Sequence, residues 1–230
     1  MKLEENPKLE QNPKLEENPK IEENPKSEQN GKIQKFLSLS EEKRDRIINA
    51  AMKEFSYGYK RASTDKIVKD AGISKGLLYH YFGTKENLFW FICTYGNDIG
   101  KSNYVDVINM GHRDILEIFW QRALLRRDMT DKYPHIYEFS NGAMAHLDDI
   151  PEGMLDFFIQ EGEDNFQELI KVCDTSLFRD DIDPIAAMDL IFWSIEGFFD
   201  YSKMKSEDYE IFLEGLRVYL DTFRKCFYKQ

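Results

Sequence analysis

The chain has 230 residues, of which 42% are hydrophobic, 14% aromatic and 32% charged, and its formal net charge is −11 at pH 7. This apolar content is sufficient for a sizeable core, so disorder throughout the chain is excluded. A protein that coats nucleic acid over its whole surface would be strongly basic, and the acidic balance excludes that class too. A small, local DNA-binding module is still compatible with these numbers.

The cysteines are Cys93, Cys173 and Cys226, which are odd in number, far apart and without a C-x-x-C pair. This usage excludes a disulfide framework and a zinc ribbon, and it fits a reducing cytoplasm. No apolar stretch follows the first residues, so we expect no secretory signal. The longest apolar stretch, residues 190–199, falls short of the ~20 residues of a membrane span. We therefore predict a soluble, cytoplasmic protein without membrane contact.

Residues 1–32 repeat a hexapeptide of the type Lys-Leu-Glu-Glu-Asn-Pro, with four clear copies and a degraded fifth. Each copy carries at most one aliphatic residue, and the recurring proline removes a helix hydrogen bond every six positions. Such a segment cannot bury enough apolar surface to offset the entropy of ordering. We therefore predict that residues 1–32 form a disordered tail. Its role is open, and a repeat expansion without function is the simplest interpretation.

The sign of the charge changes along the rest of the chain. Residues 33–86 hold eleven Lys and Arg against seven Asp and Glu, whereas residues 87–230 hold fourteen against twenty-seven. A small basic module followed by a large acidic one is the pattern expected when only the first part meets a polyanion.

The basic module predicts four helices in a row. Ser38 and Glu41 have the spacing of a capping box, and apolar residues at helical spacing follow as far as Phe55. Ser63 or Thr64 is expected to cap a second, short helix. The N-caps expected for the third and fourth helices are Ser74 and Thr84.

Two of these short helices are joined through Ala71-Gly72-Ile73-Ser74, which is the pattern of a helix-turn-helix. The surrounding run is Gly58-x5-Thr64-x2-Ile67-x3-Ala71-Gly72-Ile73-Ser74-Lys75-Gly76-x-Leu78-Tyr79-x-Tyr81-Phe82-x-x-Lys85-Glu86-x-Leu88. This run resembles the N-terminal domain of the tetracycline-repressor (TetR) family over roughly residues 40–90. Because it is long, ordered and free of gaps, it is far more specific than a helix-turn-helix pattern alone.

The resemblance implies which residues meet DNA. The first turn of the recognition helix would approach base edges in the major groove, where Lys75 can donate to guanine O6 and N7. Other polar groups would bond phosphates and set the register of the protein on the duplex. The DNA-binding residues that the resemblance implies are Thr64, Ser74, Lys75, Gly76, Leu77, Tyr79, His80, Tyr81 and Lys85.

The acidic module also reads as helices, with breaks near Gly111, at residues 132–134, at 148–151, at 175–184 and at 203–206. Asp183-Pro184 is a cap followed by proline at the first helical position, and Ser206 is expected to cap the last helix. In the TetR family the last two helices form the dimer interface. The candidate interface residues are Ile195, Phe199, Phe212, Leu216, Tyr219 and Phe223, although an ordinary core within one chain is the alternative.

The resemblance also implies a small-molecule pocket in the acidic module. The candidate lining consists of aromatic residues and of acids in apolar surroundings: Glu117, Trp120, Tyr137, Glu138, Phe157, Phe158, Trp193 and Glu196. A buried carboxylate beside aromatic rings suits a lipophilic cation, and we hypothesise such a ligand; Glu196→Gln would then weaken its binding. The histidines lack paired-ligand spacing and no catalytic motif occurs, so we expect no metal, no cofactor and no enzyme activity.

These observations predict an all-α fold. An N-terminal three-helix helix-turn-helix DNA-binding domain, residues 33–83, is followed by a larger helical domain for ligand binding and dimerisation, residues 84–230. The function that the resemblance implies is a ligand-responsive regulator of transcription, a repressor, that binds a palindromic double-stranded operator as a homodimer. The alternatives are a DNA-binding regulator without an effector, and an all-α protein that binds a partner and whose helix-turn-helix is vestigial.

Overall fold

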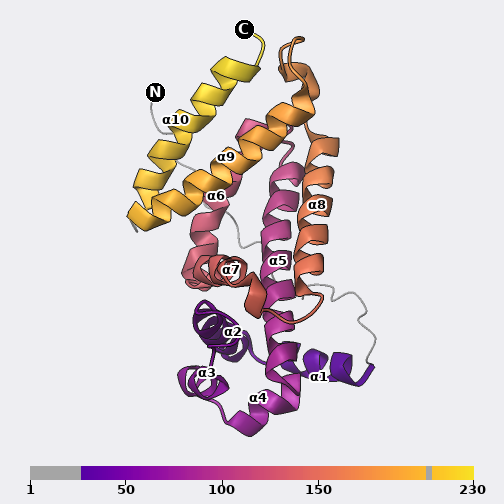
Figure 1. The fold of residues 1–230 in the computed structure, drawn as a ribbon, viewed down its shortest axis with the longest axis vertical. Coiled ribbons are helices and arrows are strands. Elements are labelled where there is room, and N and C mark those ends of the chain that lie inside the picture. Colours follow the sequence, from indigo (N-terminus) through magenta and orange to yellow (C-terminus); the bar gives the residue numbers. More distant parts are fainter. Residues whose placement is uncertain (1–26, 206–208) are drawn as a thin grey trace.

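The computed structural model describes residues 27–205 and 209–230, and these residues fold as helices joined by short connections (Figure 1). The predicted all-α fold is confirmed for this part of the chain. The helices are α1 (Ser27–Leu37), α2 (Glu41–Phe55), α3 (Thr64–Ala71), α4 (Lys75–Phe82), α5 (Lys85–Asn109), α6 (Ile115–Lys132), α7 (Ile136–Ala145), α8 (Met154–Val172), α9 (Pro184–Lys205) and α10 (Tyr209–Phe227), with short 3-10 turns η2 (Leu147–Asp149) and η3 (Thr175–Leu177).

Helices α1 to α4 form a small module at one end of the molecule (Figure 1). The chain reverses between α3 and α4 at Gly72, whose φ of +66° is favourable only for residues without a Cβ. Ser74 Oγ accepts a hydrogen bond from the backbone N–H of Leu77 at 3.2 Å, and Thr84 Oγ1 accepts one from Asn87 at 3.0 Å. Both caps predicted from the sequence are therefore confirmed.

The first helix of the module corrects two predictions. Residues 27–32, expected within a disordered tail, begin helix α1, while residues 1–26 lie outside the described part. The predicted capping box is also wrong: Ser40 is the N-cap of α2, and Ser38 Oγ instead donates to the carbonyl of Lys35 at 2.8 Å. Both corrections follow from α1, which extends from Ser27 to Leu37. Ser38 therefore lies at the C-terminal end of α1 and not at the start of α2.

Helix α1 is held by one aromatic anchor. The ring of Phe36 is fully buried, with its centroid 5.7 Å from that of Tyr81, 4.9 Å from that of Phe82 and 5.2 Å from that of Phe91. Burying a ring of this size contributes about 1.5–3 kcal/mol. The expected three-helix domain therefore carries an additional helix, which packs against the back of α4.

Helix α5 runs from the small module into a larger bundle, where α8 lies alongside it and α9 and α10 cover one flank (Figure 1). The helix ends fall at the predicted breaks. Asp183 Oδ1 accepts from the backbone N–H of Ile185 at 2.9 Å, which confirms the cap before Pro184. The predicted cap Ser206 lies outside the described residues. Among the helices of the described part, every one is too short or too polar to cross a membrane.

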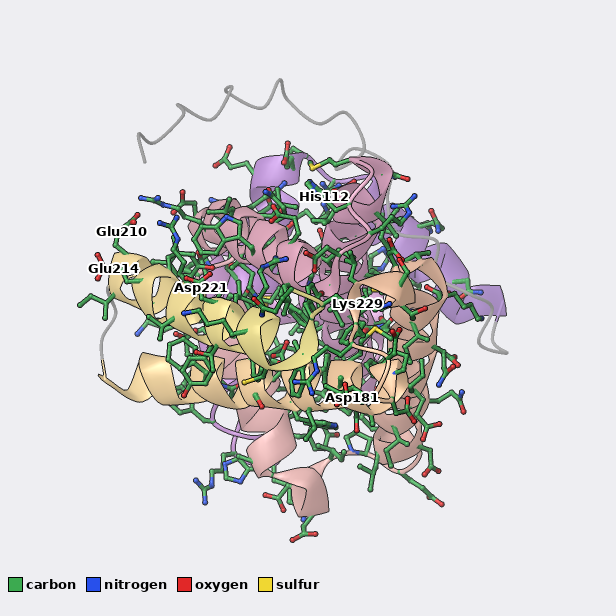
Figure 2. All side chains as sticks on the ribbon, turned by 90° about the horizontal axis from the view of Figure 1, so that it is seen from above. His112, Asp181, Glu210, Glu214, Asp221 and Lys229 are labelled. Carbon is green, nitrogen blue, oxygen red and sulfur yellow. The ribbon has the colours of Figure 1, made fainter. Side chains whose placement is uncertain are left out.

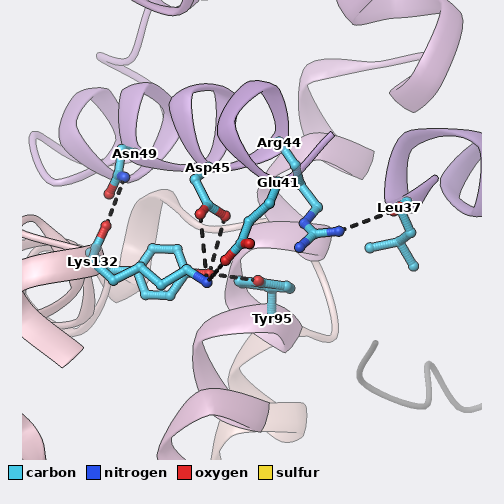
Figure 3. A network of polar contacts seen from close by, with 8 residues as sticks. Leu37, Glu41, Arg44, Asp45, Asn49, Tyr95 and Lys132 are labelled. Carbon is cyan, nitrogen blue, oxygen red and sulfur yellow. Dashed lines mark hydrogen bonds and ion pairs between the residues drawn. The ribbon is translucent and has the colours of Figure 1, made fainter. Parts of the chain in front are cut away.

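A polar network joins the small module to the bundle at the end of α6 (Figure 3). The Lys132 ammonium pairs with Glu41 and, at 3.6 Å, with Asp45, while its carbonyl accepts from Asn49 Nδ2 at 3.0 Å. Burial raises the pKa of Asp45 and the Lys132 charge opposes that rise; the hydrogen bond from Lys132 lowers the pKa of Glu41. Helix α2 is thereby attached to the last residue of α6.

Candidate DNA-binding surface and ligand site

The first turn of α4 is the most open part of the helix-turn-helix. Ser74, Lys75 and Gly76 are exposed, and the backbone N–H groups of this turn begin a helix. A Cβ added at Gly76 would meet no atom within 4 Å, so nothing in the protein itself requires glycine there. The glycine keeps the helix surface flat where the resemblance places the base edges.

Lys75 is paired in the free protein. Its ammonium lies 2.8 Å from Asp65 Oδ1 of α3, and both side chains are exposed. The hydrogen bond that Lys75 donates to the Asp65 carboxylate raises the pKa of Lys75. An exposed pair of this kind contributes little to stability, so DNA can compete for the lysine. Asp65 is not among the residues predicted from the sequence. Its position in the first turn of α3, the helix before Lys75, could have indicated this ion pair.

Four further predicted residues lie on α3, α4 and the start of α5. Thr64 Oγ1 and the Tyr79 hydroxyl share a hydrogen bond of 3.3 Å, which joins α3 to α4. Lys85 Nζ donates to the carbonyl of Lys60 at 3.3 Å and lies 4.8 Å from the centroid of the Tyr59 ring. Burial lowers the pKa of Lys85. His80 is exposed on the outer face of α4.

Two predicted DNA-binding residues point elsewhere. Tyr81 is buried and packs edge-on against Phe36, and Leu77 is half-buried against the core. The Tyr81 ring therefore belongs to the core of the module, and Thr64 is buried as well. Helical periodicity contains the reason, because Leu78, Tyr81 and Phe82 share the inner face of α4 whereas Lys75, Gly76 and Tyr79 lie on the outer face.

The predicted ligand-pocket residues are dispersed. Glu138 is exposed and faces His135 at 3.6 Å, Trp193 is 66% exposed, and Glu117 accepts from its neighbour Gln121 at 2.8 Å. The remaining aromatic residues are engaged in packing: Phe157 against Trp90 and Phe158, Trp120 beneath Arg217, and Tyr137 beneath Arg126. These residues thus make separate contacts, except that Tyr137 and Glu196 both contact Arg126.

An open depression of about 500 Å³ lies at the C-terminal end, lined by Arg179, Asp180, Asp181, Lys225, Tyr228, Lys229 and Gln230. Figure 2 shows Asp181 and Lys229 at this end of the molecule. None of the predicted pocket residues contributes to that lining.

Glu196 is held by arginines. Its two carboxylate oxygens lie 4.0 Å from Arg122 Nη1 and 3.7 Å from Arg126 Nη2, both on α6. A carboxylate that already faces two guanidinium groups attracts no further cation. The hypothesis of a cationic ligand at Glu196 is therefore not supported by this geometry.

The predicted dimer residues divide into two groups. Ile195, Phe212 and Leu216 are buried within the chain, so for these three the alternative of an ordinary core is the correct one. Tyr219 is exposed and Phe223 half-buried, while the side chain of Phe199 lies outside the described part. Large apolar side chains are exposed elsewhere on the same two helices: Ile185, Leu190, Trp193, Ile211 and Val218. Figure 2 shows α9 and α10 side by side, with Glu210 and Glu214 at the outer end of α10.

Helices α3 and α4 form a helix-turn-helix, and the first turn of its second helix is exposed. Residues 47–90 match the family model of the bacterial regulatory proteins, tetR family. The HTH-type transcriptional regulator HbdR of Aromatoleum sp. (strain CIB) is 43% identical over 53 residues, a match that spans 23% of this chain and 23% of that protein.

Solved structures extend the likeness in fold to most of the chain. The regulatory protein TetR from Rhodobacter sphaeroides has a TM-score of 0.61 at 18% identity, covering 79% of this chain and 97% of that one. SmeT, the repressor of the Stenotrophomonas maltophilia multidrug efflux pump SmeDEF, has a TM-score of 0.59 at 14% identity, covering 83% and 94%. Together, these findings show a match to the TetR family over residues 47–90 and a shared fold over most of the chain, in agreement with the resemblance seen in the sequence.

Proposed function

We propose that this chain is a cytoplasmic, homodimeric repressor without catalytic activity, which binds a palindromic operator and is released from it by a small molecule. The proposed DNA-binding domain spans residues 33–83, with α1 supporting α4 from behind. Residues 84–230 form the proposed effector-binding and dimerisation domain. The observation that carries the proposal is the open first turn of α4, with Lys75 and Gly76 facing outward.

Each group at this surface has a distinct proposed role. Lys75 leaves Asp65 and donates to guanine O6 and N7, and Gly76 allows the helix backbone to approach the groove. Thr64, Tyr79, His80 and Lys85 bond phosphates around the same groove, which positions the protein without reading sequence. The N-terminal N–H groups of α4, capped by Ser74, face the same anionic surface.

The proposed dimer uses the outer faces of α9 and α10. Leu190 and Trp193 lie three residues apart on α9, and Ile211 and Val218 lie seven apart on α10, so that each pair forms a stripe on its helix. An exposed apolar patch on a soluble regulator is characteristic of a contact with another protein surface. A second copy would place two recognition helices ~34–36 Å apart, one helical turn of DNA.

Release is proposed to pass through α6. This helix ends at Lys132, whose contacts to Glu41, Asp45 and Asn49 attach it to α2 of the DNA-binding domain. We propose that α6 can take two orientations and that the ligand binds one of them more tightly. Binding then changes the orientation of the two DNA-binding domains, and only such differential affinity can produce release.

Selection of bound duplexes from a random DNA pool tests the proposal. It is carried out with wild type, Lys75→Ala and Lys171→Ala, at two salt concentrations. Lys171 is an exposed lysine on α8, far from the DNA-binding face, and serves as the matched control. We expect a palindromic consensus for wild type and Lys171→Ala. Lys75→Ala should lose about 1–3 kcal/mol and discriminate less at one base pair. Weak binding without a consensus, abolished by salt, would contradict the proposal.

A further inference from the structure

An acidic side chain lies on the surface that is proposed to meet DNA, a polyanion. Asp65 stands in the first turn of α3, and its carboxylate lies 2.8 Å from the ammonium of Lys75 in the first turn of α4. The two side chains are 70% and 52% exposed, so that both are accessible to a duplex. A carboxylate at this place repels the phosphates of DNA, and its presence therefore calls for an explanation.

The stability of the module does not explain Asp65. The other acid of α3, Asp70, lies in the last turn and pairs with Lys53 of α2 at 3.2 Å. Glu54 of α2 is buried and accepts a hydrogen bond of 2.9 Å from a backbone N–H just before α3. These two acids attach α2 to α3. The pair of Asp65 and Lys75 instead joins two exposed first turns, where an ion pair contributes little to stability.

The binding of Lys75 to guanine leaves the Asp65 carboxylate without its cation. In the described part of the chain no other cation lies within ion-pair distance of Asp65. A carboxylate that faces the major groove without a partner is unfavourable, because it loses water and lies in the field of the phosphates. The groove offers two hydrogen-bond donors to such a group, which are the N4 amino group of cytosine and the N6 amino group of adenine.

The spacing of the two charged groups matches the edge of one base pair. Within a G·C pair, cytosine N4 donates a hydrogen bond to guanine O6, so that these two atoms lie about 2.9 Å apart. The Lys75 ammonium and the Asp65 carboxylate lie 2.8 Å apart before DNA binds. The donor of the protein can thus face guanine O6 while its acceptor faces N4 of the paired cytosine.

We propose that Asp65 reads the cytosine paired with the guanine that Lys75 reads, and so fixes the orientation of that base pair. This inference rests on the proposed function and adds a second specificity-determining residue to it. In the reversed pair Asp65 would face guanine, whose O6 and N7 are acceptors and repel a carboxylate. The flexible lysine alone reaches guanine on either strand. A T·A pair ranks between the two, because adenine N6 donates to Asp65 but thymine lacks N7.

Fluorescence anisotropy with the selected operator tests the contact. At the base pair that Lys75→Ala affects, the duplexes carry G·C, the reversed C·G, or guanine paired with N4-methylcytosine, whose methyl group replaces the amino hydrogen in the major groove. We expect wild type to bind the reversed and the methylated duplex at least ten-fold more weakly than the G·C duplex. Asp65→Ala should bind all three with nearly equal affinity. Asp70→Ala is the matched control, because it removes an exposed, paired carboxylate from the other end of α3, and it should discriminate like wild type.

The proposal is overturned if Asp65→Ala keeps the preference of wild type for G·C over C·G and merely raises the affinity for every duplex by the same factor. That result would assign to Asp65 only the repulsion of phosphates. It is equally overturned if wild type binds the methylated duplex as tightly as the normal one, a measurement that depends on no variant. A consensus without G·C at the position that Lys75→Ala affects also contradicts it. In these three cases the selected consensus, and with it the proposed function, still holds. A wild type that selects no consensus contradicts the proposed function and this inference with it.

Discussion

Some residues of α4 anchor the helix in the core, and others are exposed on its outer face. Leu78, Tyr81 and Phe82 are buried, while Lys75 and Gly76 face solvent without contributing to the core. A glycine in a helix costs about 1 kcal/mol relative to alanine, and at position 76 no neighbouring atom accounts for that cost. Packing within the protein therefore does not explain why position 76 is glycine, and a contact made by the exposed face of α4 would explain it.

Replacement of Gly76 by alanine separates stability from DNA binding. We expect Gly76→Ala to raise the free energy of unfolding by up to about 1 kcal/mol, since the new methyl group meets nothing and favours the helix. We also expect the operator affinity to fall at least ten-fold, because the methyl group separates the backbone from the base edges. Thermal melting and fluorescence anisotropy measure the two quantities.

Gly162→Ala is the control, because Gly162 is also helical, exposed and without a neighbour within 4 Å of its added Cβ, but lies on α8. It should gain stability and keep its affinity for DNA. Unchanged affinity in Gly76→Ala would show that this turn does not come close to the DNA.

The cysteines should differ in reactivity according to their burial. Cys226 is exposed, whereas burial raises the pKa of Cys173 to about 12 and that of Cys93 well above its usual value. The thiolate is the reactive form, so Cys93 and Cys173 stay protonated and react slowly at pH 8. With a disulfide reagent such as DTNB we expect one fast thiol in the native protein and three after unfolding. Cys226→Ser should remove the fast phase; a second fast thiol in wild type would contradict the structure.

At the scale of elements, α2 is attached to the larger domain at both ends. Its first half contacts Lys132 of α6, and the residues that directly follow α2 approach α7 and the residue after it at two points. A Cβ at Gly142 would lie 2.1 Å from the carbonyl oxygen of Ser56, and a Cβ at Gly58 would lie 2.9 Å from the ring of His146. The Lys60 ammonium and Asp149 add an ion pair of 2.8 Å. Motion of the larger domain therefore reaches α2 at two separate points.

The approach of α7 to α2 leaves no space for a methyl group. We expect Gly142→Ala to destabilise the protein by about 1–3 kcal/mol, because the atom it would meet belongs to the backbone and cannot rotate away. In a chain of this size each kcal/mol lowers the melting temperature by roughly 2–4 °C. Gly96→Ala is the control, since its Cβ would make ordinary contacts of 3.9 and 4.0 Å with Phe139 and Met52. Equal melting temperatures for the two variants would contradict this packing.

The sequence predicts local elements better than it predicts their partners. Ser74, Thr84 and Asp183 are caps because of bonds within a few residues, and all three are found where the sequence places them. Helix α1 was missed because its stability depends on Phe36, which is buried by residues more than forty positions away. The contact between Asp45 and Lys132 is equally non-local, and the spacing of residues in the sequence does not predict it.

At the scale of the molecule, contacts between distant parts of the chain also decide which residues of the last two helices are buried. The sequence shows that α9 and α10 are rich in apolar residues, but not which of them face inward. The structure buries Phe212 and Leu216 of α10 and leaves Val218 exposed, because α6 and α9 cover one face of α10. Glu196 illustrates the same point for charge, since its arginine partners lie some seventy residues earlier in the chain.

The exposed apolar stripe gives a test of assembly. We expect the wild type to be a dimer at micromolar concentration and Trp193→Glu to be a monomer, because a charge in the centre of the patch would be buried without a partner on dimerisation. The affinity for a palindromic operator should fall, because the two DNA-binding domains are no longer linked and no longer bind as one unit. The affinity for a single half-site should not change.

Ile159→Glu provides the matched control, because Ile159 is a similarly exposed apolar residue on α8, outside the stripe. Sedimentation velocity of the three proteins separates the outcomes. A monomeric Trp193→Glu beside a dimeric Ile159→Glu places the interface on the outer face of α9. If both variants stay dimeric, the two chains meet through another surface, and the spacing of the recognition helices must be set there.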